Sequence, residues 1–142
     1  MILVDSSVWI DYFRSESTLH TAQLDLWLDT PVVVIATADL VVFEVMRGFR
    51  HDRSRLAAQA LLLNLPIVEI GGIDNALRAA EHDRALRARG YTIRSPIDVL
   101  LASYCITHNH MLLHRADLQE PGFYTCRLET PYGTASRKLM MY

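Results

Sequence analysis

Four acidic residues stand at places in the sequence where they could share one metal ion: Asp5, Glu44, Asp98 and Asp117. Asp5 follows an apolar run at 1–4 that is typical of a buried strand. Glu44 lies in the helix expected after a second strand, Asp98 in the first turn of a later helix, and Asp117 just past a further strand. If the strands are parallel, the four acids converge on the carboxyl edge of the sheet, where α/β proteins bind their ligands.

Such a group of carboxylates has a defined chemistry. Carboxylates held close together repel one another and raise one another's pKa values, and a divalent cation removes that repulsion. A ligand set made of oxygen atoms favours Mg²⁺ (or Mn²⁺). The ion can activate water and stabilise negative charge on a phosphodiester.

Each acid also has a purely structural interpretation. Asp98 stands at the third position of a helix, where an acid satisfies backbone N–H groups and the helix dipole. Asp5 could belong to a turn, and Asp117 to an ordinary loop. Glu44 lies in an apolar stretch where an unpaired charge is costly, but Arg47 is close enough to pair with it. From the residues alone, a shared metal site and separate structural roles both remain open.

The elements that position these acids alternate between strand and helix. Apolar runs predict strands at 1–5, 32–35, 66–70 and 111–114, with a further strand near 123–127. Helical spacing and capping residues predict helices over 7–14, 17–29, 37–48, about 56–63, 73–90 and from 95 onward, with the serines after Asp5, Thr37 and Ser95 as N-caps. This alternation predicts an α/β fold: a three-layer α/β/α domain with a mainly parallel central sheet of four to five strands.

Composition narrows the class of protein further. A chain of 142 residues, 51% hydrophobic, is expected to form one domain over 1–142 with a real core. No run is apolar enough to span a membrane and no basic segment precedes the first strand, so a cytoplasmic location is expected. The net charge of −2 gives no overall basic footprint, although 13 of the 14 basic residues are arginine.

Two other enzyme classes are disfavoured. A phosphatase with an aspartyl nucleophile would carry a second acid two residues after Asp5, where this chain has Ser7. It would also use a lysine near the phosphoryl group, but the single lysine is Lys138. The sequence Gly-x-x-x-x-Gly-Lys of phosphate-binding loops is absent.

Four segments together resemble the PIN-domain ribonuclease toxins of the VapC type. They are MILVDSSVWIDYF (1–13), ATADLVVFEVMRG (36–48), RSPIDVLLASYCITH (94–108) and MLLHR (111–115). Each alone is a weak signal, but four in the right order and spacing are specific. The resemblance covers about residues 1–115.

The resemblance implies a PIN fold and a Mg²⁺- or Mn²⁺-dependent endoribonuclease that cuts structured RNA such as tRNA or rRNA. It implies that Asp5, Glu44 and Asp98 are the metal-binding acids, and that Ser7 supports the first of them. It also implies a homodimer and a cognate antitoxin that binds the toxin.

The match fails after Arg115. The acid that the toxins carry directly after this position is Ala116 here, and Asp117 stands one place late. Either Asp117 substitutes as the fourth acid, or the fourth acid is lost. Arg115 is the best candidate for a residue that holds RNA phosphate beside Asp117. The tail 118–142 does not match the family. The alternative is a catalytically degenerate PIN domain that binds RNA or an antitoxin without cleavage.

Overall fold

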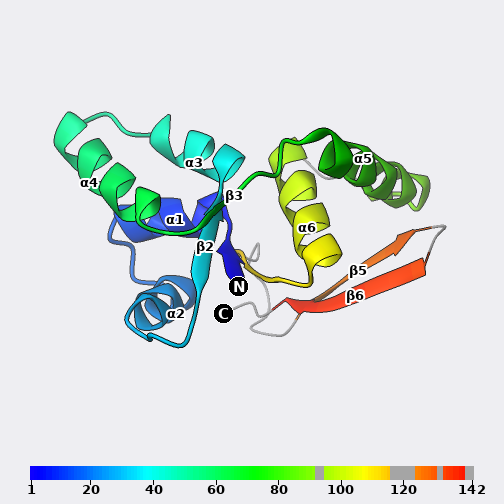
Figure 1. Cartoon of the computed structure of the whole chain (residues 1–142), viewed down its shortest axis with the longest axis horizontal. Coiled ribbons are helices and arrows are strands. Elements are labelled where there is room, and N and C mark those ends of the chain that lie inside the picture. Colours follow the sequence, from blue (N-terminus) through cyan, green and yellow to red (C-terminus); the bar gives the residue numbers. More distant parts are fainter. Residues whose placement is uncertain (92–94, 116–123, 131–132, 140–142) are drawn as a thin grey trace.

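Four short parallel strands form the centre of the computed structural model, which describes residues 1–91, 95–115, 124–130 and 133–139 (Figure 1). In the order of the sheet they are β3 (Ile67–Val68), β2 (Ile35–Ala38), β1 (Ile2–Val4) and β4 (Met111–Leu113). All three pairings between them are parallel. The first strand in the sequence is therefore an inner strand, and the carboxyl ends of all four strands lie along one edge.

Helices cover the sheet on both sides (Figure 1). On one side lie α1 (Ser6–Phe13), α2 (Leu19–Leu28), α3 (Asp39–Met46) and α4 (Asp52–Leu63). On the other side lie α5 (Ile73–Ala88) and α6 (Pro96–His108). The predicted three-layer arrangement with a parallel sheet is confirmed.

The core lies between the sheet and these helices. Leu3, Val4, Val8 and Trp9 are fully buried at the junction of β1 and α1. The ring of Trp9 stacks on Phe13, with 5.7 Å between ring centroids. This aromatic packing anchors α1, and it fixes the direction in which the helix leaves the edge of the sheet.

The predicted boundaries of the second strand are wrong. The strand was expected at 32–35 but runs from Ile35 to Ala38, because the backbone N–H of Thr37 donates to the carbonyl of Pro66 at 3.0 Å. Thr37 is therefore a buried strand residue rather than an N-cap. The N-cap of α3 is Ala38, which has no side chain to cap with.

The chain also forms a second, antiparallel sheet of two strands, β5 (Tyr124–Thr130) and β6 (Gly133–Leu139). The strand predicted near 123–127 overlaps β5, but it does not join the central sheet. A single domain over 1–142 stays a prediction. Among the described residues, no helix is long and apolar enough to cross a membrane.

Candidate active site

Asp5 occupies the point where β1 turns into α1. Its backbone N–H donates to the carbonyl of Leu113 at 2.9 Å, which fixes it against the end of β4. Its carboxylate oxygen Oδ2 accepts hydrogen bonds from the backbone N–H of Ser7 at 3.4 Å and from Ser7 Oγ at 2.6 Å. The N-cap of α1 is therefore Asp5, and the prediction that a serine caps this helix is wrong. The acid stands where the sequence placed it.

The second oxygen of this carboxylate, Oδ1, is buried and, once Asp98 is ionised, has no hydrogen-bond donor among the described residues; protonated Asp98 can donate to the Asp5 carboxylate. The residue as a whole is only 9% exposed. A buried carboxylate oxygen without a partner is costly unless another group satisfies it. A divalent cation is such a group, so the environment of Oδ1 fits a metal ligand.

Glu44 reaches the same place from α3. Its Oε1 accepts a hydrogen bond of 3.2 Å from Ser6 Oγ in the first turn of α1. The expected partner Arg47 lies instead over the ring of Phe43, 5.6 Å from its centroid. Within the described part of the chain Glu44 has no cation paired with it, so the structural explanation for this acid is not supported.

Asp98 is the third acid of the group. Asp98 is exposed at the surface, but the protein beside it still removes part of its hydration. This partial desolvation raises its pKa, and the negative charges of Asp5 and Glu44 raise it further, to about 7. An acid that only caps a helix would have its carboxylate form stabilised and its pKa lowered. Capping alone therefore does not account for Asp98, and Asp5, Glu44 and Asp98 lie close enough to oppose one another's charge.

These acids do not form a finished metal site. No three His, Cys, Asp or Glu side chains stand ready to hold an ion in the ranges that the structure describes. To hold a cation, these carboxylates would have to draw closer together, which neutralisation of their mutual repulsion would favour. Asp117, the predicted fourth acid, lies outside the described residues.

Arg115 has a partner that the sequence did not indicate. Its Nη1 contacts both carboxylate oxygens of Asp11, at 3.3 and 3.2 Å, and Nε2 of His20 lies 2.9 Å from Asp11 Oδ2. Burial raises the pKa of Asp11, but the bonds with His20 and Arg115 outweigh burial and lower it overall. One signal was available: Asp11 lies three residues after the buried Val8, on the same face of a helix.

Ser7 tests whether the position of the first carboxylate matters. The change Ser7→Ala removes the 2.6 Å hydrogen bond to Asp5 Oδ2 and leaves the backbone cap in place. We expect about a 10-fold loss of Mg²⁺ affinity with little change in melting temperature, since partners that orient a ligand are worth about 10- to 100-fold. Calorimetric titration with Mg²⁺ measures this, with Ser54→Ala on α4 as the control. Equal affinities of the two variants would contradict the role of Ser7.

Comparison with known proteins agrees with this geometry. The model of the PIN domain family matches residues 2–119, and the chain belongs to this family. It is 30% identical over 115 residues to ribonuclease VapC11 of Mycobacterium tuberculosis and to VapC ribonuclease Mb1587 of Mycobacterium bovis. Each alignment covers 81% of this chain and 86% of the relative.

Solved structures share the fold at lower identity. VapBC2 from Rickettsia felis, bound to a DNA fragment from its promoter, superposes with a TM-score of 0.64 at 19% identity. That match covers 80% of this chain and 86% of the other. VapC20 of Mycobacterium tuberculosis, described as a Sarcin-Ricin loop cleaving toxin, gives a TM-score of 0.60 at 21% identity and covers 79% and 87% of the two chains.

Proposed function

We propose that this protein is a metal-dependent endoribonuclease and the toxin of a type II toxin–antitoxin system, cutting structured RNA such as tRNA or rRNA. The observation that carries the proposal is the group of Asp5, Glu44 and Asp98 at the carboxyl edge of the sheet, with a buried, unpartnered oxygen on Asp5. The relatives named as ribonucleases, and the relative described as cleaving the Sarcin-Ricin loop, support RNA as the substrate.

In this proposal Asp5, Glu44 and Asp98 hold Mg²⁺ (or Mn²⁺), and Asp117 contributes if it reaches the site. The ion supplies Lewis acidity and activates water for attack on a phosphodiester. Two serines orient the carboxylates: Ser7 donates a hydrogen bond to that of Asp5, and Ser6 donates one to that of Glu44. Asp98 must give up its proton before it can act as a ligand, because metals bind the carboxylate form.

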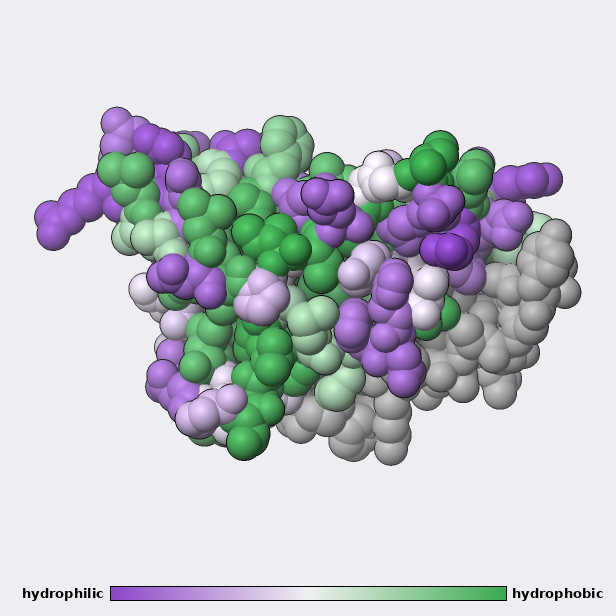
Figure 2. All heavy atoms as spheres, viewed as in Figure 1, coloured by the Kyte–Doolittle hydropathy of each residue, from purple (hydrophilic) through white to green (hydrophobic). Residues whose placement is uncertain are grey.

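We further propose a cognate antitoxin, a homodimer and a cytoplasmic location. Several related structures are toxin–antitoxin complexes, including one from Klebsiella pneumoniae. Large apolar side chains are more than half exposed on the side of α2 to α4: Leu19, Leu26, Phe43, Leu56 and Leu63. Figure 2 shows hydrophobic residues gathered over this part of the molecule. Exposed apolar surface of this kind is typical of a protein-binding face.

A catalytically degenerate PIN domain is the second candidate. Ala116 stands where the toxins carry an acid, and the three described acids do not form a finished site. A domain of this kind would bind RNA or an antitoxin and leave the RNA intact.

Removal of the metal separates the two candidates. Purified protein is incubated with total tRNA and rRNA in EDTA, and then with millimolar Mg²⁺ or Mn²⁺. We expect discrete cleavage products with either metal and none in EDTA, because cleavage in this proposal requires an ion that activates water. RNA that is bound but uncut under every condition would establish the degenerate domain instead.

A further inference from the structure

Asp11 is a buried acid that is not among the residues proposed to hold the metal ion. Its side chain is 4% exposed and that of its partner His20 is 7% exposed, whereas the side chain of Arg115 is 47% exposed. The three residues come from α1, α2 and the end of β4. These three side chains form a hydrogen-bonded network in which Asp11 and His20 are buried and Arg115 reaches the surface.

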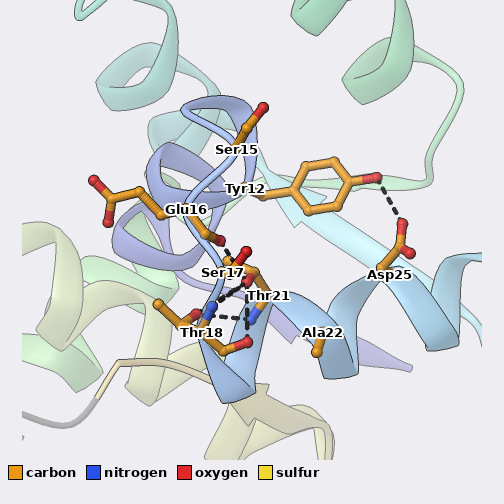
Figure 3. Close-up of a pocket in the computed structure, with 8 residues that line it drawn as sticks. All are labelled: Tyr12, Ser15, Glu16, Ser17, Thr18, Thr21, Ala22 and Asp25. Atoms are coloured by element: carbon orange, nitrogen blue, oxygen red, sulfur yellow. Dashed lines mark hydrogen bonds between the residues drawn. The ribbon is translucent and has the colours of Figure 1, made fainter.

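Figure 3 shows the turn that leads from α1 into α2, the helix whose His20 contacts Asp11. Ser15 has a left-handed backbone, with φ of 57°, and the backbone N–H of Glu16 then donates to the carbonyl of Asp11 at 3.0 Å. Thr21 Oγ1 donates to the carbonyl of Glu16 at 2.8 Å, and Thr18 and Thr21 cap each other at the start of α2. These bonds fix the first turn of α2, which carries His20.

Stability alone is a poor explanation for this network. Buried charged groups lose hydration, and apolar replacements of similar volume are often as stable. The arginine contact is also incomplete, because Nη1 alone bonds to the carboxylate. The side chain of Arg115 is also 47% exposed, and the planar fork of arginine suits a phosphate.

The network also holds Arg115 at the edge that carries the acids. Arg115 is two residues past Leu113, whose carbonyl accepts from the backbone N–H of Asp5 at 2.9 Å. The Asp11 contact draws the guanidinium toward α1, the helix that Asp5 caps. Asp11 lies six residues along α1 from Asp5, about 9 Å on the helix axis, so an RNA strand that runs from the acids along α1 meets a cation whose position is already fixed.

We propose that Arg115 binds a phosphate of the RNA substrate and that the buried Asp11–His20 pair positions its guanidinium for this contact. The inference rests on the proposed function, since it names the residue that holds RNA at the same site. Arg115 is the binding residue, and Asp11 and His20 are positioning residues that act through it.

The test is RNA affinity in EDTA, where no cleavage occurs, measured over a range of salt concentrations. For Arg115→Gln we expect affinity to fall by about 10-fold and the slope of log affinity against log salt to shrink by about 0.7–0.9, the value of one phosphate contact. Arg87→Gln is the matched control, because Arg87 is also paired with an aspartate, Asp83, at the surface of α5. We expect a smaller change of slope in this control.

The substitution Asp11→Asn tests whether Asp11 positions the guanidinium of Arg115 for RNA binding. If Arg115 contributed only its charge, loss of the negative Asp11 would strengthen RNA binding. If Asp11 positions the guanidinium, the same substitution weakens binding, and it adds nothing in an Arg115→Gln background. Arg115→Lys keeps the charge and loses the planar fork, so we expect it to bind RNA nearly as weakly as Arg115→Gln. Because this variant leaves the buried Asp11–His20 pair intact, it still tests the proposal if Asp11→Asn fails to fold.

The outcomes separate this inference from the proposed function. If the wild-type protein neither binds nor cuts RNA, the proposed function fails. If the wild type binds RNA but Arg115→Gln behaves as Arg87→Gln does, or Asp11→Asn binds more tightly, only the inference is overturned.

Discussion

Asp5→Asn is expected to reduce RNA cleavage by at least about 100-fold, the upper end of the effects seen for residues that merely support a metal ligand. Asparagine keeps an oxygen that can accept from Ser7, and it is as good an N-cap as aspartate, so α1 should form normally. The amide loses the charge that draws the cation in. It also places a donor where Oδ1 had no partner, beside Asp98 and Glu44. The variant should therefore be at least as stable as the wild type without metal.

Two readouts check this prediction. Cleavage of total RNA in Mg²⁺ is compared between the wild type and Asp5→Asn, with Asp52→Asn on α4 as the control, whose side chain is 90% exposed. Growth on induced expression is then followed: we expect arrest with the wild type and with Asp52→Asn, and normal growth with Asp5→Asn. Equal cleavage by all three proteins would show that the acidic group is not the active site.

The second large effect is a loss of stability with rising pH when no metal is present. The pKa of Asp98 is raised from 3.8 to about 7 in the folded chain, first by partial desolvation and then by Asp5 and Glu44. The folded state thus holds a proton that the unfolded state has already lost between pH 4 and 7. Stability attributable to Asp98 must therefore fall across this window and level off above it. Since Asp98 is partly exposed, we reduce the full value of about 4 kcal/mol to about 2 kcal/mol.

The comparison of wild type with Asp98→Asn isolates this effect. The pH dependence that Asp11 gives to folding stability has the opposite sign. Its pKa is lowered in the folded chain, so the stability that it contributes is lost as the pH falls. Both proteins retain Asp11, so it cancels in the difference. In EDTA the melting temperature of Asp98→Asn should exceed that of the wild type by several degrees at pH 7.5 and by much less at pH 4.5. A difference that does not change with pH would contradict the coupling of the three acids.

In Mg²⁺ the wild type should have a higher melting temperature than Asp98→Asn, the reverse of the order expected in EDTA at pH 7.5. Mg²⁺ binds the carboxylate form of Asp98 in the native state, so it stabilises the wild type by mass action and has less effect on the variant. The increase in melting temperature that Mg²⁺ gives the wild type should grow from pH 5 to pH 7.5, because Asp98 loses its proton over this range. A wild-type melting curve that is flat across millimolar Mg²⁺ at pH 7.5 would argue against a metal site.

The sequence predicted correctly that Asp5 and Asp98 stand at helix starts, because these positions follow from local patterns. An apolar run before Asp5 and a Ser-Pro start before Asp98 place both residues at helix starts. Local patterns failed where a distant partner decides the outcome. Thr37 resembles an N-cap, but pairing with β3 keeps it in the strand. The partner of Arg115 lies 104 residues away, and no spacing rule indicates a contact of that kind.

The hydrogen bond from Asp5 to Leu113 joins residues that are synthesised more than one hundred positions apart. β1 leaves the ribosome well before β4, its neighbour in the sheet. Asp98 also arrives late, on the helix just before β4. A nascent chain therefore carries Asp5 and Glu44 without Asp98 until α6 has been made. The three acids can come together in the folded sheet only after translation has passed β4.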